Sequence, residues 1–303
     1  MNRREMLRKL AMAGVAIAGM EMVPDNQLSR LVSRVNAAPA KSTVAVAQKK
    51  TVNQTVKTAI DRLGGITEFI KKGARVVIKP NAAWAMTPEQ AANTNPEVID
   101  TLIGLCKSAG AGRITLYEHP CENYKICFQK SGIMDVCRKQ KVDFFPAREH
   151  LYRDIGLPMG KTLKRANVIG PVLDADCYIN VPVVKVHGSA TVTLAMKNQM
   201  GCVKDRGYFH RHGLHQCIAD MASAVRPTLN VIDATRALLT GGPKGPGKVK
   251  QIGRIIASTD IVAADAYTCT LLGYKPGDIG HIKIGYEMGL GEMDLGKINI
   301  MQT

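Results

Sequence analysis

Residues 176–202 read DCYINVPVVKVHGSATVTLAMKNQMGC, an apolar segment that runs directly into charged and polar residues. Residues 177–184 are β-branched and apolar with almost no alternation, which is typical of a strand covered on both faces of a parallel sheet. A helix is expected over residues 191–199, because their apolar side chains recur at helical spacing, Ser189 can begin it and Gly201 can terminate it. This strand and this helix predict the centre of an α/β fold.

Two chemically active side chains, Lys185 and His187, follow the predicted strand at once. In an open α/β sheet ligands bind at the carboxyl ends of the strands, so both residues are expected at a site. The alternative is that Lys185 is a solvated strand end and His187 an ordinary loop residue.

Strand and helix patterns alternate along the whole chain after residue 40. This alternation predicts a mostly parallel, doubly wound sheet with helices on both faces. We expect strands at residues 43–47, 75–79, 113–118, 142–145, 177–184, 228–233, 252–258 and 297–301, and helices at 51–72, 97–109, 123–140, 191–199, 214–225 and 261–272.

Polar residues recur at the ends of these predicted strands. Lysines supply charge for an anion, asparagines supply amide donors, and a histidine or a carboxylate can exchange a proton. Asn95 has a second interpretation, as the N-cap of the helix that starts with Pro96. The candidate residues are Lys185, His187 and Asp233 for catalysis, and Lys79, Asn81, Asn95, Lys197 and Asn198 for binding a small carboxylate or phosphate ligand.

The sequence contains no Walker loop, no GxGxxG motif after a strand and no GxSxG elbow. The usual nucleotide-binding and hydrolase motifs are therefore absent.

Four of the eight cysteines, Cys121, Cys127, Cys137 and Cys202, follow elements that the fold can bring together. Four converging thiolates could hold an iron–sulfur cluster, which is the cofactor we expect. The spacing matches no standard ferredoxin run, and a Cys121–Cys127 disulfide is the alternative. The other cysteines include Cys106, Cys177 and Cys269, which lie in apolar patterns typical of buried small side chains.

A dense group of imidazoles and one thiol occurs at His210, His212, His215 and Cys217. Such a group is a candidate metal site. A basic loop before the helix at residues 214–225 explains the same residues.

The N-terminal residues have the layout of an export signal. Arg3-Arg4 and further basic residues precede an apolar run at residues 10–20, and residues 37–40, AAPA, offer a small-residue cleavage site. The paired arginines predict a twin-arginine signal over residues 1–40, and hence a periplasmic or otherwise exported protein that uses the twin-arginine machinery. The alternative is an ordinary secretory signal or an N-terminal anchor, and the apolar run is too short for a stable membrane span.

The chain has 303 residues and a formal net charge of +16. Removing the six basic and three acidic residues of the first forty leaves +13. This charge can attract nucleic acid, anionic lipid or small acidic molecules. Nucleic acid is not expected as a partner, because no arginine-rich arm, aromatic stacking platform or binding motif accompanies the charge.

Several motifs occur together in one order: RVVIKPN, QAANTNPEVI, SGI, INVPVVKVHG, MKNQMG, NVIDATRALLTGGP and GLGEMDL. In this set the chain resembles the bacterial DUF362 family in its exported form, over residues 41–303. The resemblance implies a single α/β domain and an association with exported redox or cofactor-containing proteins. Some members carry an attached ferredoxin-like segment, and this sequence does not contain that cysteine run.

Three functional hypotheses follow. The first is an exported redox protein with an iron–sulfur cluster and a redox partner protein. The second is a non-redox enzyme that acts on a small carboxylate or phosphate ligand through the lysine, histidine and aspartate residues. The third is a binding protein for the same kind of anion.

Overall fold

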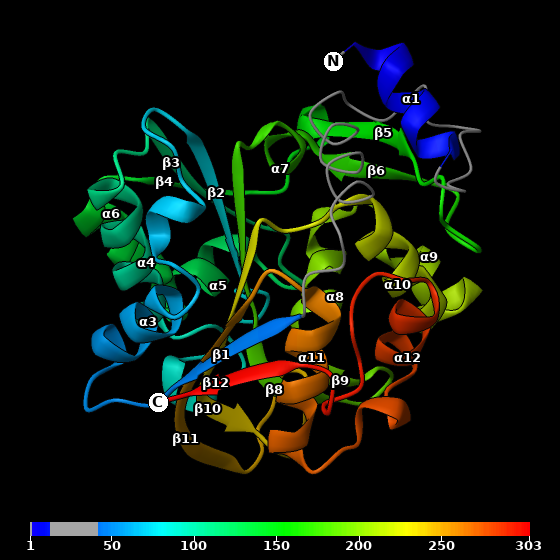
Figure 1. Ribbon diagram of the computed structural model, residues 1–303. Coiled ribbons are helices and arrows are strands. Elements are labelled where there is room, and N and C mark those ends of the chain that lie inside the picture. The colour runs from blue at the N-terminus through cyan, green and yellow to red at the C-terminus, as the bar shows by residue number, and fades with distance from the viewer. Residues whose placement is uncertain (1, 13–41) are drawn as a thin grey trace.

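The computed structural model describes residues 2–12 and 42–303 of the chain. A ten-stranded sheet forms the centre of the second range, with helices on both sides (Figure 1). Its main path runs β12-β1-β11-β10-β7-β2-β3-β4, and β8 and β9 extend it beside β10. The strands are β1 (Thr43–Ala47), β2 (Arg75–Pro80), β3 (Arg113–Glu118), β4 (Asp143–Pro146), β7 (Cys177–Val181), β8 (Val183–His187), β9 (Thr191–Thr193), β10 (Leu229–Leu238), β11 (Val249–Ser258) and β12 (Asn299–Gln302).

The strands from β4 through β3, β2 and β7 to β10 all pair in parallel. Antiparallel pairing enters where β11 joins β10 and β1. The predicted mostly parallel α/β sheet is therefore confirmed.

The order of the strands reverses between β2 and β7. From β2 the chain continues outward to β3 and β4, whereas β7 is followed by β8 and β10 on its other side. Ligands of open α/β sheets bind outside the carboxyl ends of strands at such a switch point.

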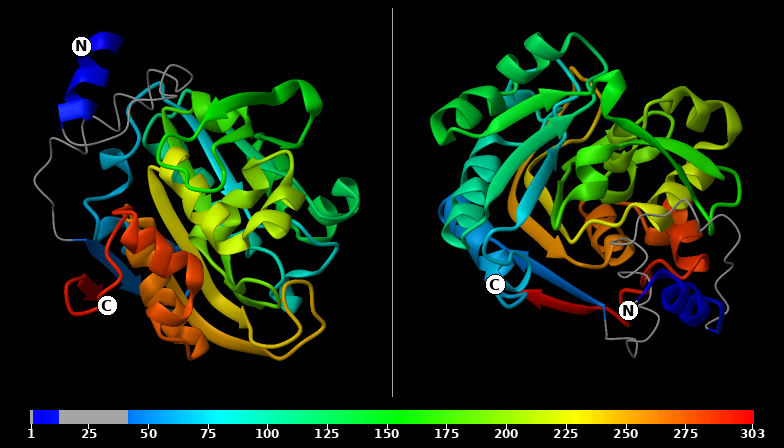
Figure 2. Two further views of the ribbon diagram at one scale, coloured as in Figure 1. Left: turned by 90° about the vertical axis from the view of Figure 1, so that its right-hand side faces the viewer. Right: turned by 90° about the horizontal axis from the view of Figure 1, so that it is seen from above.

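The helices divide between the two faces of the sheet. Seen from above in Figure 2, the cyan and teal helices lie on one side of the sheet, and the yellow to red helices lie on the other. The first group has an apolar layer that includes Ile60, Leu102 and Phe128, and the second has a layer that includes Met196, Ile218 and Val262. The first group is α3 (Val52–Asp61), α4 (Pro96–Ser108), α5 (Tyr124–Lys130) and α6 (Ile133–Gln140); the second includes α8 (Ala195–Asn198), α9 (Arg206–His212), α10 (Leu214–Ala224), α11 (Ile261–Cys269) and α12 (Gly280–Glu287).

The predicted strand at residues 177–184 is two strands. Pro182, which has no N–H to donate, separates β7 from β8, and its carbonyl accepts from Asp233 N at 2.8 Å. The predicted helix at residues 191–199 is also different, because Thr191–Thr193 forms β9 and pairs antiparallel with β8. The β-branched residues favour the hairpin, and only the four residues of α8 remain α-helical, followed by a 3-10 helix at Gln199–Cys202.

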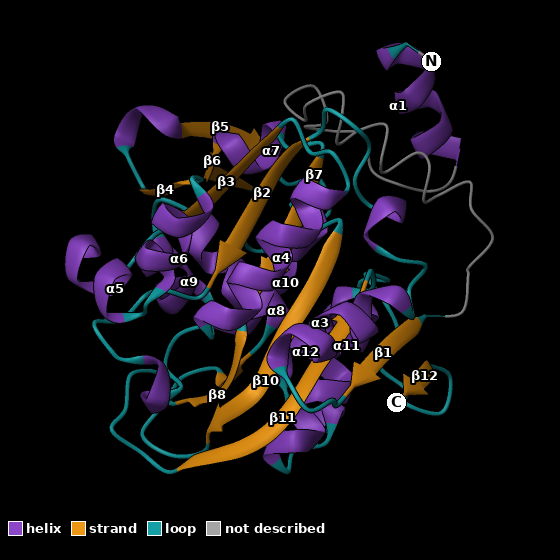
Figure 3. Cartoon of the chain, turned by 90° about the vertical axis from the view of Figure 1, so that its left-hand side faces the viewer, coloured by secondary structure: helices purple, strands orange, loops and turns teal. Residues whose placement is uncertain are grey.

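The predicted helix at residues 123–140 is divided as well. Gly132, with φ of 75°, lies between α5 and α6 and begins the second helix in a left-handed conformation. The following segment lacked a clear pattern and contains the antiparallel hairpin of β5 (Tyr152–Gly156) and β6 (Arg165–Ile169), followed by α7 (Gly170–Asp174). Ile155 and Val168 of this hairpin belong to the same apolar layer as Met196 and Ile218, and Figure 3 shows the hairpin at the top of the view beside α7.

At the N-terminus the described residues form α1 (Arg3–Met12), which contains the arginine pair. The apolar run and the small-residue end of the predicted signal extend into residues 13–41, outside the described range. None of the helices in the described part of the chain is long and apolar enough to cross a bilayer.

Candidate functional site

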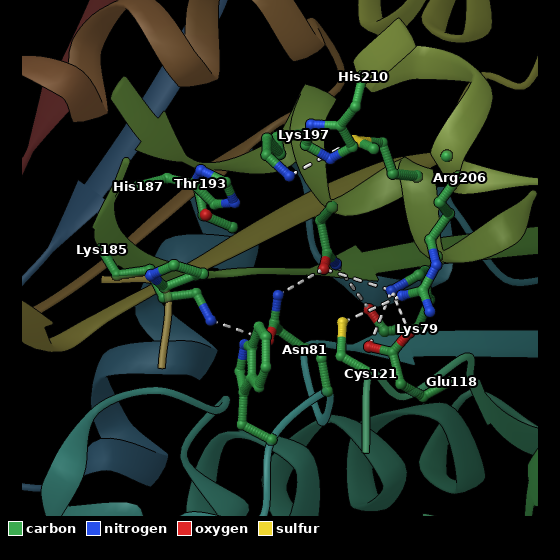
Figure 4. A pocket seen from close by; sticks show the side chains of 17 residues that line it. Lys79, Asn81, Glu118, Cys121, Lys185, His187, Thr193, Lys197, Arg206 and His210 are labelled. Atoms are coloured by element: carbon green, nitrogen blue, oxygen red, sulfur yellow. Dashed lines mark hydrogen bonds and ion pairs between the residues drawn. The ribbon is translucent and has the colours of Figure 1, made fainter. Parts of the chain in front are cut away.

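A cavity of about 370 Å³ lies at the carboxyl ends of β2, β3 and β8, beside the switch point of the sheet (Figure 4). Strands β2 and β3 contribute Lys79 and Glu118, and β8 contributes Lys185. From the other side of the cavity, α8 contributes Lys197 and α9 begins with Arg206. Residues distant in sequence therefore meet where the topology predicts a ligand.

Lys79 and Glu118 form a buried ion pair in the cavity wall. Their side chains are 1% and 2% exposed, and Lys79 Nζ lies 3.0 Å from both carboxylate oxygens. Glu118 also accepts hydrogen bonds from Ala82 N and His119 N. The carboxylate is thus fully engaged by the protein and is not left to neutralise another cation.

A chain of amides joins this ion pair to Lys185. Asn198 Oδ1 accepts from Lys79 Nζ at 3.3 Å and from Asn81 Nδ2 at 3.1 Å. Asn81 Oδ1 in turn accepts from Lys185 Nζ at 3.3 Å. On the other side, Asn198 Nδ2 donates to Asn180 Oδ1 at 2.8 Å, which fixes the orientation of its amide. Four of the predicted residues, Lys79, Asn81, Lys185 and Asn198, therefore belong to one network.

Lys185 is 1% exposed and has no carboxylate partner among the ion pairs of the described residues. Its Nζ donates to the carbonyl oxygen of Ala92 at 2.6 Å as well as to Asn81. Burial, and secondarily the charge of Lys197, lowers the pKa of Lys185 to about 7.

Lys197 and Arg206 bring two further cations to the cavity. Lys197 Nζ contacts Met200 Sδ at 3.4 Å, and burial lowers the pKa of Lys197 to about 8. Arg206 donates to the carbonyl oxygens of His119 and Pro120 and approaches Cys121 Sγ at 3.3 Å. Within the described residues neither cation lies within 4.0 Å of a carboxylate oxygen.

His187 is held as a neutral ring with a defined tautomer. The backbone N–H groups of Ser189 and Ala190 donate to its Nδ1 at 3.1 and 3.3 Å, so the ring proton belongs on Nε2. Burial and the nearby lysines lower the pKa of His187 to about 3. This arrangement makes His187 a hydrogen-bond donor near neutral pH, rather than the titrating group that the sequence predicts.

Thr193 lies opposite Lys185 in the β8–β9 hairpin and also lines the cavity. Its side chain is 4% exposed, and its Oγ1 has no hydrogen-bond partner in the described part of the protein. Because buried hydroxyl groups are almost always paired, this hydroxyl is available to hydrogen-bond a polar group in the cavity.

Asp233 and Asn95 lie outside the cavity wall. Asp233 Oδ2 accepts from Asn95 N at 2.7 Å, and its other oxygen accepts from Thr235 N and Oγ1. Asn95 caps α4 by accepting from Glu97 N at 3.1 Å. Burial raises the pKa of Asp233. In this arrangement Asp233 anchors the start of α4, and its predicted catalytic role stays a prediction.

Residues 76–270 match the family model described as a domain of unknown function, DUF362. The chain belongs to the DUF362 family.

One relative of this DUF362 chain is a thylakoid-associated protein of Synechocystis sp., which is 25% identical over 245 residues. That match covers 78% of this chain and 74% of the relative. Among solved structures, the lactate racemase apoprotein from Thermoanaerobacterium thermosaccharolyticum has a TM-score of 0.51 at 12% identity, covering 78% of this chain. The chain spans 58% of the length of the racemase, and the likeness shows the shared α/β fold.

The DUF362 fold does not assemble the predicted cysteine ligands. Cys127 and Cys137 lie in the apolar layer under α5 and α6, whereas Cys202 lies in the layer on the opposite face of the sheet. Burial raises the pKa of Cys127 and Cys202 to about 11 and that of Cys137 to about 12, which disfavours thiolates. Cys121 alone faces the cavity, and its sulfur is not bonded to Cys127.

No group of three or more histidine, cysteine or acidic side chains in residues 2–12 and 42–303 could hold a metal ion. The four cysteines therefore do not fit an iron–sulfur cluster in this arrangement. The structure does not bring these four cysteines together, because they come from elements on opposite faces of the sheet, and the iron–sulfur cluster stays a prediction.

The histidines at residues 210–217 are dispersed and belong to α9 and α10, not to a loop. His210 lines the cavity, and the ring of His212 stacks on Tyr208 with centroids 3.9 Å apart. His215 Nδ1 contacts His281 Nδ1 at 3.1 Å, and Cys217 is buried.

Sequence reasoning missed Glu118, Thr193 and Arg206. The position of Glu118 at the end of a predicted strand was a usable signal, identical to that of Lys79. Arg206 and Thr193 carried no such signal, because their places depend on the packing of α9 and on the β8–β9 hairpin.

Proposed function

We propose that this DUF362 protein binds a small carboxylate- or phosphate-bearing molecule in the cavity at the switch point. One observation carries the proposal. Lys79, Lys185, Lys197 and Arg206 line the cavity, and Glu118 is the one carboxylate among the lining residues. Since Lys79 engages Glu118, the other three cations face the cavity without a counter-charge.

Removing a cation from water costs several kcal/mol unless an opposite charge compensates for it. The lowered pKa values of Lys185 and Lys197 express this cost. A bound anion would offset it, while the unpaired hydroxyl of Thr193 and the Nε2–H of His187 could donate to the ligand. Lactate, the substrate named for the structural neighbour, is a molecule of this class.

A thermal-shift screen with lactate, pyruvate and inorganic phosphate tests the proposal. We expect at least one anion to raise the melting temperature of the wild type in a saturable way, and to raise that of Lys197→Ala much less. The matched control is Lys57→Ala, an exposed lysine of α3 outside the cavity wall. Equal shifts in all three proteins, or no shift with any anion, would refute the proposal.

An iron–sulfur redox protein with a partner protein is the second candidate, motivated by the predicted export signal and the cysteine content. It would require cysteine ligands brought together in an arrangement other than the one described for residues 2–12 and 42–303. Iron and acid-labile sulfide content of anaerobically purified protein tests it, and stoichiometric amounts of both would favour it over the anion-binding proposal.

We also propose that residues 1–40 export the chain through the twin-arginine route to the periplasm. The support is the Arg3-Arg4 pair followed by the apolar run. A reporter fused after residue 40 should be exported, and Arg3→Lys with Arg4→Lys should retain it in the cytoplasm. Export that continues in the double variant would reject this route.

A further inference from the structure

We propose that Lys185 attacks the carbonyl carbon of a small 2-oxo acid and forms an imine with it, while Lys197 and Arg206 bind the carboxylate. This inference rests on the proposed anion-binding function and assigns its ligand class and its reacting atom. Lys185, its cross-strand neighbour Thr193 and the cations Lys197 and Arg206 all line the same cavity (Figure 4).

The hydrogen bonds of Lys185 suit an amine. A neutral Nζ has two N–H bonds and one lone pair. Ala92 O at 2.6 Å and Asn81 Oδ1 at 3.3 Å accept two N–H bonds. The lone pair is then directed away from both acceptors and stays available to a ligand in the cavity that Lys185 lines.

The charges around Lys185 favour the neutral form. No carboxylate in the described residues lies within 4.0 Å of its Nζ, and Lys197 is the largest charge that opposes its protonation. A lysine that is desolvated next to a second cation is an activated nucleophile towards carbonyl carbon. Its pKa of about 7 leaves a large fraction of the amine neutral near neutral pH.

Lys79 is the contrasting lysine in the same cavity. Its Nζ contacts both oxygens of Glu118, Pro80 O and Asn198 Oδ1. Presenting a lone pair would therefore cost Lys79 its buried ion pair. Lys185 is therefore the more reactive of the two lysines, because only Lys79 is held in a buried ion pair.

Proton donors accompany the reacting amine. Thr193 is the direct cross-strand neighbour of Lys185, and its buried hydroxyl has no partner in the described part of the chain. His187 follows two residues later with its proton on Nε2. Either group can donate to the carbonyl oxygen of the ligand as negative charge develops there.

The step balances as follows. The Nζ lone pair forms a bond to the carbonyl carbon, and the carbonyl oxygen becomes a hydroxyl group by taking up a proton. The hydroxyl then leaves as water after a second protonation, with both protons replaced by those that nitrogen loses. The products are the imine and one water molecule, and no oxidant or reductant takes part.

Reductive trapping tests the inference with the full-length protein. Wild-type protein is incubated with pyruvate and sodium cyanoborohydride, digested and mapped by mass spectrometry. We expect one carboxyethyl group per chain, on Lys185 and not on Lys79, and competition by lactate, which has the carboxylate but no carbonyl group. Lys185→Met should lose the adduct while the exposed-lysine variant Lys57→Ala keeps it.

The peptide map of the wild type decides the matter even if Lys185→Met does not fold. Adducts spread over surface lysines, or none at a pyruvate concentration that saturates the thermal shift, would overturn the imine and leave the anion-binding proposal intact. Absence of the adduct together with absence of a thermal shift by pyruvate, lactate and phosphate would overturn both proposals.

Discussion

Lys79 Nζ lies 3.0 Å from both carboxylate oxygens of Glu118, and the two side chains are almost completely buried. This pair takes up the one carboxylate of the cavity wall and leaves Lys185, Lys197 and Arg206 facing the cavity. The Lys79–Glu118 pair is thus the reason that the cavity is cationic.

Replacing Glu118 by glutamine should destabilise the protein strongly. The change would leave the Lys79 ammonium buried without its counter-charge, which typically costs about 3–5 kcal/mol in the free energy of unfolding. Denaturant unfolding measures it. The matched control is Asp143→Asn, which breaks an exposed pair with Arg113 and should cost less than about 1 kcal/mol. Similar losses in both variants would contradict the structural importance of the buried pair.

Gly201 should not tolerate a side chain. A Cβ at this position would lie 2.5 Å from Glu118 Oε1 and 2.7 Å from Lys79 Cε. We expect Gly201→Ala to lower the free energy of unfolding by about 1–3 kcal/mol through overpacking. Gly188→Ala is the control, because a Cβ there has no heavy atom within 4 Å, and it should be close to neutral. Unchanged stability of Gly201→Ala would show that the cavity wall is looser than described.

Lys185 and Lys197 should make stability rise with pH from about 7 up to the usual lysine pKa of 10.5. The pKa values of Lys185 and Lys197, lowered by burial to about 7 and about 8, lie below the usual 10.5 of lysine. The unfolded chain then holds more protons than the folded chain. The free energy of unfolding therefore increases by up to about 1.4 kcal/mol per pH unit for each lysine. Urea unfolding at about pH 7 and about pH 9 should show a smaller rise in Lys185→Met than in the wild type, and an equal rise would rule out this origin.

Asp265 should act on the cavity through the position of α8. Its carboxylate accepts from Ala195 N at 2.6 Å and Met196 N at 2.9 Å, at the start of the helix that carries Lys197 and Asn198. Asp265→Asn replaces one acceptor oxygen by a donor, so we expect weaker anion binding with saturable binding retained. Titration of the variant with the same anion measures this, and wild-type affinity would argue against a positioning role.

The sequence predicts where the strands end better than it predicts how the strands pair. Runs such as RVVIK, followed by Pro80 and Asn81, show where a buried strand stops and a polar side chain begins, so Lys79 and Lys185 could be assigned. The β8–β9 hairpin could not be assigned, because residues 191–199 satisfy a helical spacing as well as a strand composition. Tertiary pairing with β8 decides between the two.

The cysteine ligand set shows what the sequence could not predict. Their order along the chain allows convergence, but a helix or strand position also specifies a face, and that face is fixed only by packing. Cys177 and Tyr178 illustrate this, since adjacent residues of β7 enter the two different apolar layers. A ligand set drawn from several elements therefore needs the face of each element as well as its position.

Calorimetric titration of the wild type and Lys197→Met with lactate, which has no carbonyl carbon for Lys185 to attack, at about pH 7 and about pH 9, tests the cationic cavity most directly. Since anions favour protonated lysines, the account predicts saturable binding to the wild type that weakens as pH rises past the pKa values of about 7 and about 8. It predicts at least about tenfold weaker binding in Lys197→Met, because about 1.4 kcal/mol or more of attraction is lost. Equal affinity in the two proteins, or binding that does not depend on pH, would contradict it.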